Sequence, residues 1–146
     1  MALPNDKPFY RHRGYQYPTA QIVEILHENA IKDYGGLLGI RDPGALESAL
    51  SAPLVMAGGE DAYPTFFNMV AAIGFRLAKN HPFNDVNKRT TWLTVAATLK
   101  RNGYYPRRPD TELEDMMVLL AAGHDIAGFW VFLLIACNQD YTDERL

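Results

Sequence analysis

The sequence His-Pro-Phe-Asn-Asp-Val-Asn-Lys-Arg, residues 81–89, gathers polar and charged side chains at the junction of two predicted helices. Pro82 disfavours the α conformation of the residue before it, so a helix over residues 65–79 is expected to end near His81. Apolar residues at helical spacing resume after the stretch and indicate a second helix over residues 88–102. The stretch therefore predicts a helix, a short loop and another helix.

The start of the second helix has the features of an anion site. Asn87 is its predicted N-cap, which leaves the backbone N–H groups of Lys88, Arg89 and Thr90 at the positive end of the helix dipole. The phosphates of a nucleotide fit such a start better than a carboxylate does. The reason is that Arg89 can contact two oxygens at once and Lys88 adds a compact charge.

Three further residues complete the candidate site. Asp85 offers one carboxylate beside the expected phosphates, which suits Mg²⁺, a cation that takes oxygen ligands and shares them with nucleotide and water. His81 carries an imidazole with an ordinary pKa of about 6.5, so it can accept a proton from an attacking hydroxyl near neutral pH. Lys79 can reach a phosphate, although a cation in the last turn of a helix is also favourable through the dipole alone.

Each of these residues also fits a purely structural interpretation. A histidine before a helix is often packed or hydrogen-bonded in the fold, Asp85 can act as a cap, and Lys88 with Arg89 can be a solvated helix start. The joint pattern favours a functional site, since six specified positions fall within nine residues.

The motif resembles that of the Fic/Doc family, and its Asn84–Arg89 portion is most similar to the Doc (death-on-curing) branch. The similarity extends over about residues 17–138, including Tyr-Gly-Gly at 34–36 and Leu-Lys-Arg-Asn-Gly at 99–103. The resemblance implies an all-α fold, a compact helical bundle with a transferase site at the motif loop. It also implies a short flap near that site at residues 54–64, for which a hairpin and a plain loop remain open.

Roles carry over onto matching positions only. By resemblance, His81 is the catalytic histidine, Asp85 the Mg²⁺ ligand, and Asn87, Lys88 and Arg89 the residues that bind the phosphates. The implied cofactors are ATP and Mg²⁺.

Two departures from the family motif favour one of its two chemistries. Members that transfer AMP to a hydroxyl usually have Gly at the position of Lys88 and a second Arg at the position of Trp92. Doc-type members transfer the γ-phosphate of ATP instead. Val86 stands where the family commonly has Gly and the Doc branch has Ala, and its β-branched side chain limits the backbone of the loop.

The resemblance thus implies a Doc-like toxin of a toxin–antitoxin pair. Such a kinase phosphorylates a Ser or Thr hydroxyl of a protein, elongation factor Tu by resemblance, and inhibits translation. Its expected partner is a Phd-like antitoxin with a helical segment that lies in a groove of the toxin. The alternatives are a Fic-type adenylyltransferase and a catalytically silent helical binding module.

The whole chain sets further bounds. With 146 residues and 48% hydrophobic content it predicts a Fic/Doc domain over residues 17–139, an extended arm over residues 1–16 and a frayed tail over residues 140–146. A net charge of −3 lacks the basic surplus that is typical of proteins that bind nucleic acid directly. The single Cys137 fits a reducing compartment. With neither a signal peptide nor a membrane span expected, the prediction is a cytoplasmic protein.

Local signals predict the remaining helices. One begins at Thr19 and ends at the glycine pair 35–36, and a short one begins at Asp42 and stops at Pro53. Thr111 and Glu114 have the spacing of a capping box, which predicts a helix to about residue 122. The final predicted helix spans residues 128–138 and is apolar on all sides.

Overall fold

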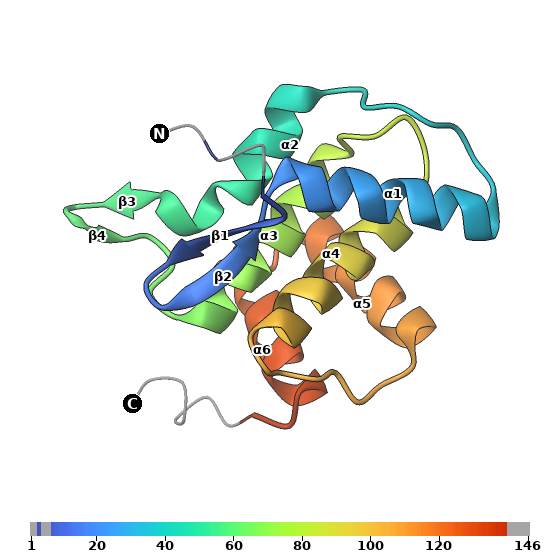
Figure 1. The fold of residues 1–146 in the computed structure, drawn as a ribbon. Helices are drawn as coiled ribbons and strands as arrows, with labels where there is room; N and C mark the ends of the chain where they lie inside the picture. The colour runs from blue at the N-terminus through green and yellow to red at the C-terminus, as the bar shows by residue number, and fades with distance from the viewer. Residues whose placement is uncertain (1–2, 4–6, 140–146) are drawn as a thin grey trace.

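A computed structural model describes Leu3 and residues 7–139 of the chain. Within this part, six α-helices and two small antiparallel hairpins form the fold, which confirms the predicted all-α class with a short hairpin (Figure 1). The elements are β1 (Phe9–His12), β2 (Tyr15–Pro18), α1 (Ala20–Tyr34), α2 (Pro43–Leu50), a 3₁₀ turn (Ala52–Leu54), β3 (Met56–Ala57), β4 (Glu60–Asp61), α3 (Phe66–Asn80), α4 (Asn87–Arg101), α5 (Asp110–Ala122) and α6 (Ile126–Ala136).

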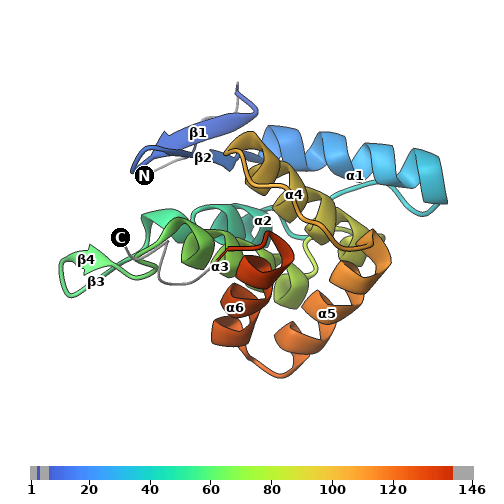
Figure 2. The same ribbon diagram turned by 90° about the horizontal axis from the view of Figure 1, so that it is seen from below.

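Helix α3 is the centre of the fold, since α2, α4, α5 and α6 all pack against it (Figures 1 and 2). Its middle carries Gly74, at which an added Cβ would lie 2.8 Å from Cζ of Phe129 and 2.9 Å from Cγ2 of Val95. Both neighbours are fully buried, and they come from α6 and α4. Gly74 therefore sets how closely α4 and α6 approach α3.

The first hairpin differs from the prediction of an extended arm over residues 1–16. Strands β1 and β2 pair in register and turn through Arg13 and Gly14, both of which have a positive φ, as two-residue hairpin turns of the primed types require. Tyr10 and Tyr17 are buried, and the Tyr10 hydroxyl donates a hydrogen bond to the carbonyl of Leu50 at 2.7 Å. The strands are four residues long, too short for a clear period of two in sequence. The predicted tail at 140–146 lies outside the described residues.

The second hairpin decides between the two alternatives left open for residues 54–64, which contain the paired strands β3 and β4. In both views β3 and β4 project from the end of the molecule at which α3 begins, whereas the 81–89 motif follows the end of α3 (Figures 1 and 2). Helix α3 lies between the hairpin and the motif, and its 15 residues span about 22 Å. Asp61 ties the hairpin to β1–β2 through Arg13, whose Nε and Nη2 lie 3.1 and 3.3 Å from the two carboxylate oxygens.

The starts of α5 and α6 differ from the predictions. Helix α5 begins at Asp110 with Pro109 at the N-cap and no side-chain cap, so Thr111 and Glu114 form no capping box. Helix α6 begins at Ile126, earlier than predicted, because the Asp125 side chain accepts a hydrogen bond from the amide of Gly128 and acts as the N-cap. The Asp125 cap is a local contact over three residues, whereas Glu114 is paired with Arg89 of α4.

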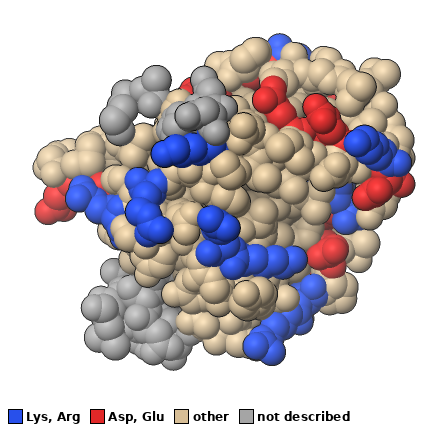
Figure 3. Space-filling view, in the orientation of Figure 1, with Lys and Arg blue, Asp and Glu red and all other residues tan. Residues whose placement is uncertain are grey.

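Charge is unevenly distributed over the face shown in Figure 3. Lys and Arg side chains lie along the β1–β2 hairpin and the end of α4, whereas Asp and Glu side chains lie over α1. The exposed cations of the hairpin and the end of α4 are Arg11, Arg13, Lys100 and Arg101, and Arg107 and Arg108 follow in the connector to α5. Among the residues described, no helix has the length and apolar content that crossing a bilayer requires.

Replacement of Gly74 by Ala tests the close approach of the three helices. We expect the added methyl group to displace Phe129 or Val95 and to lower the free energy of unfolding by about 1–3 kcal/mol. Urea unfolding of the purified protein measures the change. The control is Gly44→Ala in α2, where the new Cβ meets only ordinary contacts; it should leave stability unchanged or raise it by about 0.4–1 kcal/mol. Equal stability of the two variants would contradict this packing account.

Candidate functional site

The loop between α3 and α4 is bounded by two residues with left-handed backbone conformation. His81 follows the last residue of α3 with φ 46° and ψ 62°, and Val86 precedes α4 with φ 59° and ψ 35°. Non-glycine residues rarely adopt this conformation, and a β-branched residue such as Val86 does so at a particular energetic cost. Such strain persists only where the surrounding structure enforces it, and it occurs often at functional sites.

The constraint on the loop comes from its buried centre. Phe83 is 2% exposed and stacks on the ring of His27, with ring centroids 3.9 Å apart and an interplanar angle of 12°. Nε2 of His27 lies 2.9 Å from the carbonyl oxygen of Asp85, so this histidine is packed within the fold. Phe83 also forms a β-bridge with Ile40. Phe83 thus anchors the loop in the core.

Arg41 fixes the other side of the loop. Its guanidinium donates hydrogen bonds to the carbonyls of Asn80, at 2.7 Å, and of His81, while its backbone amide donates to the Pro82 carbonyl at 2.8 Å. The carbonyls at the end of α3 thereby gain donors that the helix itself cannot supply. Sequence analysis missed Arg41, because nothing in the local pattern connects residues forty positions apart.

Asn87 does not cap α4, contrary to prediction. Helix α4 begins at Asn87 itself, Val86 takes the N-cap position, and no side chain caps the first turn. The Asn87 amide instead reaches back to Phe83: its Oδ1 accepts from the Phe83 amide and its Nδ2 donates to the Phe83 carbonyl, both at 3.0 Å. Asn87 therefore closes the loop and does not cap the helix, as the sequence had predicted it would.

The missing cap leaves the start of α4 open. Asn87, Lys88 and Arg89 are the first three residues of the helix, so their N–H groups have no acceptor within it. Among the described residues, no side-chain acceptor replaces the cap. These amides and the positive end of the dipole can bind an anion.

A pocket of about 200 Å³ lies beside this helix start, between the end of α3, the beginning of α4 and one face of α5. It brings together four of the six residues predicted for the site. Its polar lining comes from Lys79, His81, Asn87, Lys88 and Thr91, and its apolar lining from Ala78, Met117, Val118, Ala121 and Ala122. His81 is exposed here. The Nζ atom of Lys79 lies 3.3 Å from Nε2 of His124.

Asp85 and Arg89 do not line this pocket. Asp85 is exposed; its Oδ1 accepts from the Val86 amide at 2.9 Å and its Oδ2 from the Leu37 amide at 3.2 Å. Each oxygen keeps a lone pair for a further partner. Within the described part of the chain, no three His, Cys, Asp or Glu side chains cluster into a metal site by themselves.

Arg89 is held by residues that sequence analysis did not assign to the site. Its Nε pairs with Oε1 of Glu114 on α5, and its guanidinium lies over the ring of Tyr34 at 4.4 Å. Glu114 is 3% exposed, and burial raises the pKa of its carboxyl, although the nearby Arg89 acts in the opposite direction. Lys88 pairs with Asp115 at 3.1 Å, but both of those side chains are more than half exposed.

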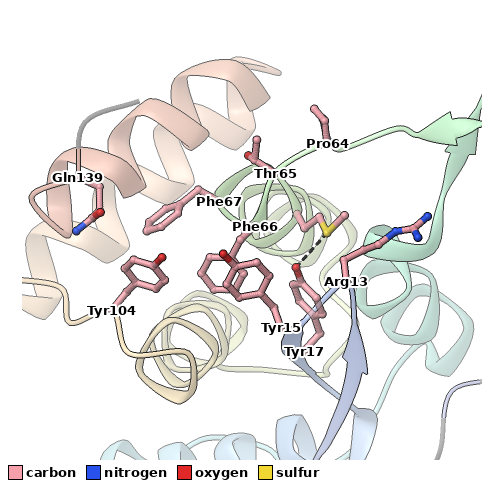
Figure 4. Close-up of a pocket in the computed structure, with 10 residues that line it drawn as sticks. Arg13, Tyr15, Tyr17, Pro64, Thr65, Phe66, Phe67, Tyr104 and Gln139 are labelled. Atoms are coloured by element: carbon pink, nitrogen blue, oxygen red, sulfur yellow. Dashed lines mark hydrogen bonds between the residues drawn. The ribbon is translucent and has the colours of Figure 1, made fainter. Parts of the chain in front are cut away.

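A larger pocket of about 300 Å³ lies at the other end of α3 and contains no residue of the motif. Figure 4 shows its aromatic lining, in which Tyr15 and Phe66 are stacked with centroids 4.5 Å apart and Tyr104 lies beside Phe67. Arg13 at its edge is paired with Asp61. The combination of exposed imidazole, cations and free amides occurs only at the smaller of these two pockets.

Comparison with known proteins gives the family. The sequence model of the Fic/DOC family matches residues 17–99, more than half of the chain. The chain belongs to the Fic/DOC family. The motif loop, α4 up to Leu99 and the anchoring residues His27 and Arg41 all lie inside this match, which confirms the family resemblance.

Two relatives show how far the similarity to named members of the Fic/DOC family extends. "Toxin Doc" of Mycolicibacterium smegmatis is 41% identical over 70 residues, which cover 48% of this chain and 54% of that protein. "Protein kinase doc" of Escherichia phage P1 is 35% identical over 98 residues, which cover 67% of this chain and 76% of that protein. The chain thus matches about half the length of the first relative and three quarters of the second.

The closing role of Asn87 can be measured through stability. Asn87→Ala removes both hydrogen bonds to Phe83 and leaves a partly buried amide and carbonyl without partners, so we expect unfolding to become easier by about 1–3 kcal/mol. Asn84→Ala, with one exposed hydrogen bond to Leu38, is the matched control and should change stability by less than about 0.5 kcal/mol. Urea unfolding compares the two. Similar values for both variants would show that the Asn87 contacts do not hold the loop.

Proposed function

We propose that this Fic/DOC protein is a Doc-type toxin, a kinase that transfers the γ-phosphate of ATP to a Ser or Thr hydroxyl of a protein. The uncapped start of α4 beside the exposed imidazole of His81 carries this proposal. The similarity to a phage P1 relative named "Protein kinase doc" supports phosphoryl transfer, and the name "Toxin Doc" of the other relative supports a toxin.

In the proposed reaction the phosphates bind at the start of α4. The free N–H groups of Lys88 and Arg89 donate to phosphate oxygens, while the Lys88 and Lys79 side chains add positive charge at the pocket. The apolar wall from α5, with Met117 and Val118, offers a surface that excludes water from part of the ligand. Positioning and charge stabilisation then supply much of the catalysis.

His81 acts on the protein substrate. Its imidazole accepts the proton of the attacking hydroxyl as the oxygen bonds to the γ-phosphorus, and ADP leaves with the electrons of the broken P–O bond. The left-handed conformation of His81 and the hydrogen bonds from Arg41 to its carbonyl fix the position of its Cα and therefore the base of its side chain. This placement suits a base that has to meet a substrate arriving from solvent.

Asp85 is the proposed Mg²⁺ ligand. Its exposed carboxylate makes one hydrogen bond with each oxygen, and no further acidic side chain is required, because Mg²⁺ usually takes one or two carboxylates and completes its shell with phosphates and water. When bound, the metal ion neutralises charge on the phosphate oxygens. The donor set therefore fits an ion that is shared with ATP.

Substrate and partners follow from the family resemblance. We propose elongation factor Tu as the protein substrate, with inhibition of translation as the consequence, and a Phd-like antitoxin as the partner that restrains the toxin in the cytoplasm. The name "Toxin Doc" supports the existence of an antitoxin. The exposed Leu37 and Leu38, next to the motif loop, offer apolar surface for such a partner.

Replacement of His81 tests the chemistry directly. His81→Ala should lower the rate of phosphoryl transfer by about 10²–10⁴-fold and abolish toxicity in bacteria, since the imidazole that accepts the hydroxyl proton is removed. Incubation with ATP and elongation factor Tu, followed by mass spectrometry, shows whether the modified peptide gains one phosphate or one AMP. The control Asn84→Ala, in the same loop, should retain activity. An AMP adduct would establish the adenylyltransferase alternative, and unchanged toxicity of His81→Ala would favour a silent binding module.

Replacement of Asp85 tests the metal. Asp85→Asn keeps the size of the side chain but removes its charge, so we expect the Mg²⁺ concentration for half-maximal transfer to rise at least about tenfold. Titration of Mg²⁺ at constant ATP measures this concentration. Asp33→Asn, an exposed carboxylate at the end of α1, is the control and should titrate like the unmodified protein. An unchanged Mg²⁺ requirement in Asp85→Asn would exclude Asp85 as the ligand.

A further inference from the structure

We infer that Glu114 is a positioning residue for ATP binding, which acts by holding the guanidinium of Arg89 at the start of α4. This inference rests on the proposed function and names a residue that the family motif does not contain. It depends on three side chains from three elements: Tyr34 at the end of α1, Arg89 in the first turn of α4 and Glu114 in α5.

The contacts of Arg89 use only part of its guanidinium. Glu114 pairs with the Nε atom, and the centroid of the Tyr34 ring lies 4.4 Å from Cζ on one face of the guanidinium. An arginine has five N–H donors, four of which belong to its two Nη groups. Neither contact uses the Nη groups, and Arg89 is the third residue of α4, so these donors belong to the same first turn as the free amides.

Burial of Glu114 holds the ion pair between Glu114 and Arg89 in one arrangement. Glu114 is 3% exposed, and the structure gives its carboxylate no charged partner other than Arg89 within contact distance among the described residues. A buried carboxylate without a partner is strongly unfavourable, and this cost opposes the exchange of Glu114 for a phosphate at Arg89. The ion pair thus holds Arg89 in place before the nucleotide arrives, which reduces the ordering that binding requires.

The neighbouring pair lacks these properties. Lys88 and Asp115 are also an α4–α5 ion pair, but both side chains are more than half exposed. Exposed pairs of this kind contribute little and re-form readily in solvent. Lys88 is consequently free to turn towards the pocket that it lines, whereas Arg89 is not.

The alternative is that Glu114 competes with the phosphates for Arg89 and restrains the enzyme. Competition requires the carboxylate to be released when ATP binds, and burial opposes that release. The two possibilities predict opposite effects of neutralising Glu114. Loss of a positioning contact weakens ATP binding, whereas loss of a competing anion strengthens it.

The main experiment is the conservative substitution Glu114→Gln in the full chain. The dissociation constant of Mg²⁺-ATP is measured by calorimetry, and KM and kcat are measured by transfer to the protein substrate. We expect the dissociation constant and KM to rise about tenfold or more, with a smaller change in kcat. Glu112→Gln is the matched control, because it makes the same chemical change on the same helix at an exposed pair with Arg108, and it should bind ATP normally.

A double-mutant cycle separates positioning from general stability. If Glu114 acts through Arg89, Glu114→Gln has no further effect on ATP binding in the Arg89→Ala background. Tyr34 gives an independent check, since Tyr34→Leu removes the aromatic face beneath Arg89 and should weaken ATP binding. Thermal unfolding of every variant sets a temperature at which all are folded.

Three results would overturn the inference: unchanged ATP binding in Glu114→Gln, tighter binding in that variant, or the same loss in the Arg89→Ala background as in the unmodified protein. A protein that binds ATP but transfers no group would instead count against the proposed function. Because ATP binding is measured without turnover, the two failures can be told apart.

Discussion

The hydrogen bonds between the Asn87 side chain and the backbone of Phe83 are the contact on which the candidate site depends. They close the 81–86 loop against the first turn of α4, and they keep the Asn87 amide from capping that turn. One side chain thus has two effects: the loop is held in a defined shape, and the amides of the helix start stay free. An anion site at a helix start requires both, because a mobile loop or a filled cap would weaken it.

The backbone conformation of the loop is energetically unfavourable, and packing of the loop against the core maintains it. His81 and Val86 both have left-handed backbone conformations, while Phe83 between them is buried against His27 and bridged to Ile40. Val86 stands where the family motif commonly has glycine, so this chain adopts with a β-branched residue a conformation that glycine adopts freely. The side chain of Val86 also fills the space next to Gly36, where an added Cβ would lie 2.7 Å from it. Gly36 is therefore needed for close approach to the loop.

Trp92 shows how a family departure becomes structural. It occupies the position at which AMP-transferring members usually carry a second arginine, and here it is 2% exposed, with its indole Nε1 donating to Asp110 at 2.9 Å. Asp110 is the first residue of α5, so Trp92 helps to hold against α4 the helix that supplies both Glu114 and the apolar wall of the pocket. This chain thus has an α4–α5 contact in place of a second cation.

The helices, their order and a candidate site could be predicted from the sequence, because helical periodicity, the proline after His81 and the dense motif are local properties. It also identified four residues that meet at one pocket: Lys79, His81, Asn87 and Lys88. Tertiary structure alone decided what Asn87 and Glu114 do, since each has the residue type and spacing of a helix cap and each is bound elsewhere. A side chain that can cap a helix can also form hydrogen bonds or ion pairs of similar energy with other groups. Which of these groups lies within reach depends on how distant segments pack.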